Sequence, residues 1–186
     1  GVDGDEDNDT GIWSGAVYVF TRSGNDWLQE SYIKASNTDT YDQFGAAVSV
    51  YEDTLAVGAL FEDSIATGVN SNQTNDSAGD SGAVYLFTRT SGSWNQQAYI
   101  KASNTEQTDW FGLSVAISGD TLVVSAINES SNAIGTNGDQ TDDSLLFSGA
   151  TYLFTRAGST WLQDSYIKAS NPNVYDKFGY SVSISD

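Results

Sequence analysis

The sequence predicts an all-β fold, a β-propeller built of four-stranded antiparallel blades. Three observations predict it. The phrase SGAVYVFTR at Ser14 recurs, with small changes, at Ser81 and Ser148, so the copies are evenly spaced along the chain. Alternating and β-branched runs separate the turns, and no stretch keeps the helical period of about 3.6. Finally, an even spacing of this kind is typical of stacked supersecondary units that bury their faces against one another.

The repeat covers the chain without one insertion. The shift that carries Ser14 onto Ser81 also aligns Trp27, Trp94 and Trp161; Lys34, Lys101 and Lys168; and the Phe-Gly pairs at Phe44, Phe111 and Phe178. The chain divides into the end of a blade (1–43), two full blades (44–110 and 111–177) and the first strand of another (178–186). Three blades are fewer than the ~4–8 of known propellers. We therefore expect a segment of a longer polypeptide, or self-association in which neighbouring chains complete the incomplete blades.

Each full blade is expected to contain four strands. Phe44–Val50 alternates and ends in a tight turn, and Thr54–Ala59 has the small and β-branched residues of a buried strand. Gly82–Arg89 is apolar on both sides and must be covered on both faces. Ser93–Ala102 mixes apolar and polar residues, which predicts a half-exposed edge strand where Lys101 discourages unwanted pairing. On this interpretation, Lys101→Ala costs no more than ~0.5 kcal/mol.

The composition excludes several classes of function. The chain carries 25 acidic and 7 basic residues, a net charge of −18, which argues against nucleic acid as a partner. No apolar run approaches the ~20 residues of a membrane helix, so we expect no membrane insertion. His and Cys are absent, and no acidic residue lies in an apolar context that would raise its pKa. The sequence therefore predicts that the protein is not an enzyme.

The spacing of FGAAVSVYEDTLAVGA and SGAVYLFTR resembles the FG-GAP repeats of integrin α-subunit propellers and of bacterial secreted proteins. The resemblance implies that Phe44, Phe111 and Phe178 wedge between blades. It also implies that the glycine after each of them allows close backbone approach. An extracellular or cell-surface location follows from the same resemblance, as does a binding or adhesion function with a protein or glycan ligand at the loop face.

Acidic residues gather in the long loop before each SGA phrase. FG-GAP repeats often carry a calcium loop between their first two strands, but the turns at that place are too short here. In Val2–Gly11 the carboxylates alternate instead, and such a set can supply the six to eight oxygens that calcium takes. The predicted ligands are Asp3, Asp5, Asp7, Asp9, Asp76, Asp139, Asp142 and Asp143. The alternative is that these residues cap turns through their own backbone.

A second acidic set, Asp42, Asp109 and Asp176, lies two residues before each Phe-Gly pair. We expect these carboxylates to orient the loop at the start of each blade.

Aromatic residues near the blade starts are the candidate ligand-binding residues: Tyr41, Trp110 and Tyr175, together with Trp13 and Phe147 before the SGA phrases. An aromatic face of this kind can stack on a sugar ring, as in lectins. The alternative is ordinary packing between blades. The sequence thus leaves three functions open: an adhesion module with a protein partner, a carbohydrate-binding lectin, and a self-assembling structural subunit of a filament or surface layer.

Overall fold

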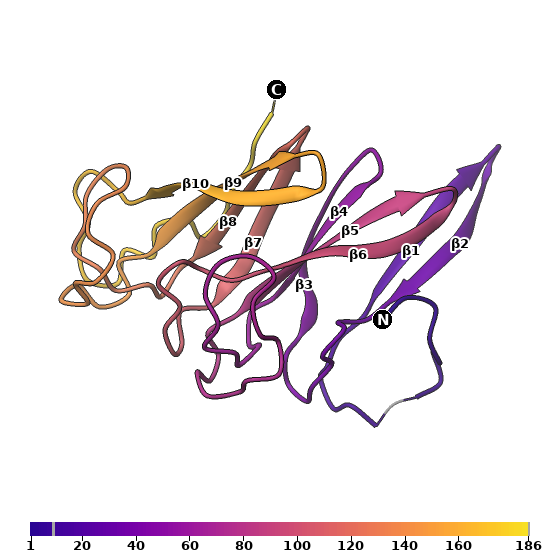
Figure 1. Ribbon diagram of the computed structural model, residues 1–186, viewed down its shortest axis with the longest axis horizontal. Coiled ribbons are helices and arrows are strands. Elements are labelled where there is room, and N and C mark those ends of the chain that lie inside the picture. Colours follow the sequence, from indigo (N-terminus) through magenta and orange to yellow (C-terminus); the bar gives the residue numbers. More distant parts are fainter. Residues whose placement is uncertain (9, 186) are drawn as a thin grey trace.

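The computed structural model describes residues 1–8 and 10–185, and within these ranges it contains strands and no helix (Figure 1). Consequently no helix in the described part of the chain is long enough to cross a membrane. The strands form three antiparallel sheets, which we call units I, II and III. Unit I contains β1 (Val17–Ser23) and β2 (Asp26–Ile33). Unit II contains β3 (Phe44–Tyr51), β4 (Thr54–Ala59), β5 (Ala83–Thr90) and β6 (Ser93–Ile100). Unit III contains β7 (Phe111–Ser118), β8 (Thr121–Ala126), β9 (Ala150–Ala157) and β10 (Thr160–Ile167).

Units II and III keep the strands in sequence order, so each is a meander. β4 is buried along its whole length because it lies between β3 and β5 in the sheet and between units in the stack. The first five residues of β5 are also buried, so both faces of this strand are covered, as its apolar pattern predicts. The prediction of four-stranded antiparallel sheets is confirmed for units II and III.

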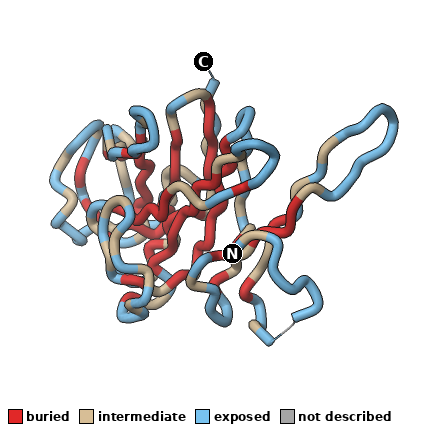
Figure 2. Tube along the Cα trace, turned by 45° about the vertical axis from the view of Figure 1, so that its right-hand side comes forward, coloured by how far each residue is buried: buried red, intermediate tan, exposed pale blue. Residues whose placement is uncertain are grey.

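The core lies between the units. One cluster joins Val17 and Ile33 of unit I to Tyr85 and Phe87 of unit II, and a second joins unit II to unit III. Phe44 is 2% exposed, and its ring lies edge-on to Tyr85 at 5.3 Å between centroids. Figure 2 shows buried chain concentrated in the stacked sheets, whereas the far end of one hairpin projects into solvent. The phenylalanine therefore fills the space between neighbouring units, as expected.

The Ser-Gly dipeptide of the repeated phrase contacts the Phe-Gly pair that follows it one connection later in the chain. The amide of Phe111 donates to the carbonyl of Ser81 at 2.9 Å, and Phe44 and Phe178 make the same bond to Ser14 and Ser148. Gly82 has a φ of +83°, and a Cβ there would lie 2.1 Å from the Phe111 carbonyl oxygen. Only glycine fits so close an approach of two backbones. This contact explains why the phrase recurs unchanged at Ser-Gly.

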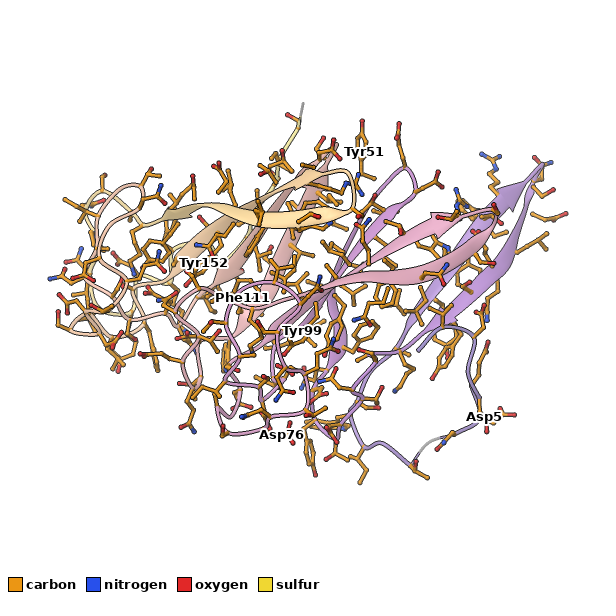
Figure 3. All side chains as sticks on the ribbon, in the orientation of Figure 1. Asp5, Tyr51, Asp76, Tyr99, Phe111 and Tyr152 are labelled. Atoms are coloured by element: carbon orange, nitrogen blue, oxygen red, sulfur yellow. The ribbon has the colours of Figure 1, made fainter. Side chains whose placement is uncertain are left out.

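The stack has two different ends. The hairpin end carries the tight turns, such as 51–54 and 90–93, and the loop end carries the long connections, such as 60–82 and 101–110. Tyr51 and Asp76 mark these opposite ends in Figure 3. The loop end holds nearly all the residues that the sequence singles out as candidates.

The expected first strand of a further blade at 178–186 does not form. Residues 178–185 contain no strand, although Phe178 and Val182 hydrogen-bond to Ser148 and Ser114 of unit III.

Candidate functional site

At the loop end, the segment before β1 is hydrogen-bonded to the segment before β3, and residues of both have an unusual backbone conformation. We call this contact between neighbouring units a crossing. Tyr41 donates its amide to the carbonyl of Ile12 at 2.9 Å, and Gln43 donates to Trp13 at 3.0 Å. Trp13 and Tyr41 both have positive φ, at 54° and 76°. This left-handed conformation is rare for bulky side chains and costs about 1–3 kcal/mol each, so its occurrence suggests a function.

The crossing between units I and II carries an aromatic pair at the surface. Trp13 and Tyr41 meet edge-to-face with 6.0 Å between ring centroids, yet they remain 70% and 55% exposed. Phe147 and Tyr175 repeat the arrangement beside unit III at 5.6 Å, and Tyr175 is 60% exposed. Interblade packing therefore does not account for Tyr41 and Tyr175, because most of each ring faces solvent.

The crossing between units II and III has the same backbone with different side chains. Asp80, Thr108 and Trp110 occupy its three left-handed positions, and the amide of Trp110 donates to the carbonyl of Asp80. The Trp110 ring lies edge-on to Phe61 at 5.6 Å, and the ammonium of Lys177 lies over its face at 5.6 Å. Trp110 is half-buried by these contacts. The structure thus separates Trp110 from the two exposed tyrosines with which the sequence groups it.

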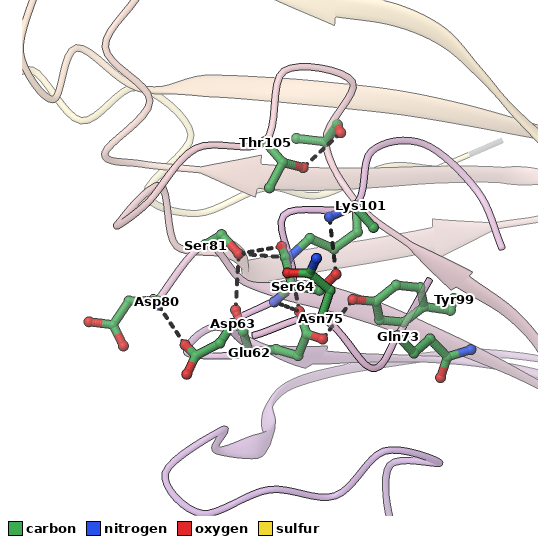
Figure 4. Close-up of polar contacts among 12 residues, drawn as sticks. Glu62, Asp63, Ser64, Gln73, Asn75, Asp80, Ser81, Tyr99, Lys101 and Thr105 are labelled. Atoms are coloured by element: carbon green, nitrogen blue, oxygen red, sulfur yellow. Dashed lines mark hydrogen bonds and ion pairs between the residues drawn. The ribbon is translucent and has the colours of Figure 1, made fainter. Parts of the chain in front are cut away.

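Beneath the loop end, unit II buries a charged network (Figure 4). The Lys101 ammonium donates to the Glu62 carboxylate at 2.9 Å and to the Ser81 hydroxyl at 2.7 Å. Glu62 also accepts from the Tyr99 hydroxyl at 2.7 Å and from the Asn37 amide at 3.1 Å. Burial lowers the pKa of Lys101, and the Glu62 charge opposes this shift. Unit III repeats the network with Glu129, Lys168 and Tyr166.

The interpretation of Lys101 as a solvent-exposed edge residue is wrong. Its side chain is fully buried, and it lies just beyond β6, where the chain turns under the loop before β5. The sequence pattern shows a polar residue after a strand, but it does not show that Glu62, 39 residues away, supplies the compensating charge.

A pocket of about 220 Å³ opens at the loop end beside Tyr41. Five carboxylates line it: Asp39, Asp42, Glu62, Asp63 and Asp76. Asp42 accepts the Asp39 amide at 3.0 Å, and Asp109 and Asp176 accept the amides of Glu106 and Asn173 in the same way. The prediction that these three aspartates orient the loop is thereby confirmed.

The statement that no acidic residue lies in an environment that raises its pKa is also wrong. Burial raises the pKa of Asp42 to about 7 and that of Asp109 to about 8, and nearby carboxylates reinforce both shifts. The sequence around both residues is polar, so this environment arises only when the loops fold together.

Four of the eight predicted calcium ligands, Asp3, Asp5, Asp139 and Asp142, accept backbone amides. Asp3 accepts the amide of Tyr32 at 3.0 Å, and the neutral side chains of Asn70 and Asn137 make the same bond in units II and III. Asp5 and Asp139 accept the amides of Asp7 and Thr141, and Asp142 accepts that of Ser144. Where asparagine serves equally well, the negative charge is not required. The alternative of turn capping therefore accounts for these residues.

The carboxylates that remain do not gather into a metal site. Asp76 lines the acidic pocket, Asp143 bonds to the side chain of Glu106, and Asp9 lies outside the described residues. Among the residues that the structure describes, no group of three or more acidic side chains is placed to hold one ion.

The fold and site define a class of repeat protein, with four-stranded antiparallel sheets stacked through a Phe-Gly contact and a loop end that varies between units. The model of the FG-GAP repeat matches residues 27–87 and 94–154, and the chain belongs to this family. FG-GAP repeats are often binding or adhesion modules and usually occur in extracellular or surface proteins. No curated protein matches the chain.

Sequence reasoning missed the buried network and the role of Phe61. A signal for the network was present, since Glu62, Ser81, Tyr99 and Lys101 all recur one repeat later as Glu129, Ser148, Tyr166 and Lys168. Phe61 gives no such signal, because Asn128 stands at the equivalent position.

Proposed function

We propose that the units are blades of a β-propeller and that the protein is an extracellular, non-enzymatic binding module for a protein partner. The exposed aromatic pair of Trp13 and Tyr41 supports this function best. Surface pairs of large aromatic rings held in a strained backbone are typical of recognition sites, because they offer apolar area with little entropy to lose on binding.

A non-enzymatic role is supported by the state of the buried acids. Glu62 is engaged by Lys101, Tyr99 and Asn37, and Asp42 caps a backbone amide. Both carboxylate oxygens of Glu62 are thus occupied, and the side chain of Asp42 serves the loop backbone.

Binding to cell-surface proteins tests the proposal. Trp13→Ala and Tyr41→Ala should each weaken binding at least about tenfold, the usual effect of removing an aromatic anchor. Trp27→Ala is the matched control, because Trp27 is 67% exposed but lies on the hairpin of unit I. Equal losses in all three variants would contradict a site at the loop end.

A lectin function is the second candidate, favoured by the exposure of Tyr175 and Tyr41, whose rings can stack on a sugar. Binding to a glycan array distinguishes the two candidates. Signal on glycans that Tyr41→Ala and Tyr175→Ala abolish would favour the lectin, and binding to protein ligands stripped of glycans would favour adhesion.

Calcium binding by the first loop is a separate proposal that rests on composition alone. Calcium at ~100 times its Kd should add ~2.7 kcal/mol to the free energy of unfolding. Thermal melts in calcium, in EDTA and in sodium chloride of equal ionic strength test it. Identical melts in calcium and EDTA would refute calcium binding, and an equal gain in sodium chloride would show charge screening.

A further inference from the structure

We propose that the loop end recognises a lysine- or arginine-rich segment of its partner, and that a cationic side chain of this segment docks on the pair of Trp13 and Tyr41. This inference rests on the proposed function and narrows the class of the partner.

The chain's own cations show how such a side chain would bind. Three tryptophan rings carry a basic group over the face: Arg89 lies over Trp94 at 5.6 Å, Arg156 over Trp161 at 5.1 Å, and Lys177 over Trp110 at 5.6 Å. The negative face of the indole attracts a cation most strongly of all aromatic rings. Among the described residues, no cation lies over Trp13, although its ring is 70% exposed. Trp13 is thus available to a cation from another molecule.

The chain on either side of Tyr41 lines an acidic pocket. Tyr41 stands between Thr40 and Asp42, which line the pocket of five carboxylates, and Asp39 and Asp76 are exposed at this pocket. A basic partner would gain both the aromatic contact and the attraction of these carboxylates. An acidic partner would be repelled.

The chain's basic residues neutralise this surface only in part, since Lys101 pairs with Glu62 of the pocket and Lys34 lies near Trp13. Lys101 and Lys168 are buried in ion pairs, and Lys34 bonds to Ser14 and Gly15. The three arginines, Arg22, Arg89 and Arg156, lie near the hairpin ends of β1, β5 and β9. The protein, with a net charge of −18, therefore keeps its guanidinium groups at the hairpin end and presents carboxylates near aromatic rings at the loop end.

The docking surface is also fixed in advance. The bonds from Tyr41 to Ile12 and from Gln43 to Trp13 hold both aromatic residues in the left-handed conformation before any partner arrives. A surface held in its binding geometry loses little freedom on association.

The test uses the indole N–H signals of the five tryptophans in a 15N-labelled chain. The probe is a peptide of ten lysines, compared with the same peptide acetylated on every side-chain nitrogen. We expect the lysine peptide to shift the Trp13 signal and to leave that of Trp27 in place. The two residues are similarly exposed, but only Trp13 contacts Tyr41, whose neighbours in the chain line the acidic pocket. Trp13→Phe and Trp27→Phe assign the two signals.

Variants at Tyr41 complete the test. Tyr41→Ala should weaken binding of the lysine peptide at least fivefold, whereas Tyr41→Phe, which keeps the ring, should retain it. Melting temperatures of all variants verify folding. Equal shifts of Trp13 and Trp27, or equal binding of the acetylated peptide, would overturn the inference. So would an unmoved Trp13 signal, but the proposed function would survive that result if a neutral protein ligand or a glycan still required Trp13 and Tyr41.

Discussion

One position of the repeat is occupied by Asp3, Asn70 and Asn137. Its charge differs between units, but its side chain makes the same hydrogen bond in each. Each side-chain oxygen caps the amide of a tyrosine in the strand at the outer edge of its unit, at 2.8–3.0 Å. The position needs an acceptor and not a carboxylate. An acidic loop can therefore look like a metal site in the sequence while its side chains serve the backbone.

Asp3→Asn should leave the free energy of unfolding unchanged within ~0.5 kcal/mol, because asparagine keeps the acceptor. Asp3→Ala should cost ~1 kcal/mol, the usual loss for a removed cap. Urea denaturation measures both. If Asp3→Asn proved as costly as Asp3→Ala, the charge itself would be needed, as a calcium ligand requires.

The buried ion pair of Lys101 and Glu62 predicts a large effect of breaking it. Lys101→Met removes one partner and leaves a buried carboxylate uncompensated, so we expect a loss of ~3–5 kcal/mol. The double variant with Glu62→Gln should recover part of this loss, since no unpaired charge remains. A loss below ~1 kcal/mol for Lys101→Met, measured by urea denaturation, would contradict the burial of the pair.

At the scale of elements, the contact between the SGA segment and the next Phe-Gly strand holds neighbouring sheets together. Gly82 and Gly92 both have φ near +80°, but a Cβ on Gly82 meets the Phe111 backbone, whereas Gly92 lies in open space. Gly92→Ala should therefore cost only the backbone strain, ~1 kcal/mol. Gly82→Ala should cost clearly more, because β7 must move. Similar melting temperatures for the two variants would show that the sheets are not in contact at this point.

The connection between β6 and β7 predicts how stability depends on pH. The pKa of Asp109 is raised to about 8 in the folded protein, above its ordinary value of 3.8, because the group is buried near Glu106, Glu129 and Asp143. The folded state thus binds the proton more tightly. This contribution to stability is complete below pH 4 and is lost as the pH rises through about 8.

The melting temperature should therefore fall between pH 5 and pH 9, and Asp42, with a pKa of about 7, contributes in the same direction. Asp109→Asn, which is neutral at every pH, should flatten the curve. A wild-type melting temperature that rises over this interval would contradict the burial of these carboxyl groups.

At the scale of the whole molecule, the sheets share their cores. The cluster around Phe111 joins Val84 and Leu86 of unit II to Val115 and Tyr152 of unit III. Units II and III should then unfold in one transition, seen alike by calorimetry and by tryptophan fluorescence. Phe111→Ala should lower this single transition by ~3–5 kcal/mol through the cavity it leaves. Two separate transitions would mean that the shared core does not couple the units.

The repeat pattern of the sequence predicts much of the strand arrangement but few of the interactions of charged side chains. Strand order and the double-sided burial of β5 follow from patterns that lie within a few residues, and the wedge at Phe44 follows from the resemblance to FG-GAP repeats. The sequence around Lys101 and Asp109 does not predict their environment. Lys101 is buried because it pairs with Glu62 from a distant loop, and the pKa of Asp109 is raised by burial and by the charge of Glu129. The exposure of Tyr41, in contrast with Trp110, likewise depends on Phe61 and Lys177. Such partners are set by the three-dimensional structure alone.

The left-handed crossing between units recurs with different occupants at its three positions. These are Trp13, Asp80 and Phe147 at the first, Tyr41, Thr108 and Tyr175 at the second, and Gln43, Trp110 and Lys177 at the third. Because the same backbone bonds recur at each crossing, its side chains can diverge without loss of the architecture. Each repeat can thus present a different set of surface side chains on the same backbone conformation. Copying the aromatic pair of Trp13 and Tyr41 onto the crossing between units II and III would give the protein a second copy of that binding site. The resulting gain in avidity would depend on the distance between the two sites and not on any new contact.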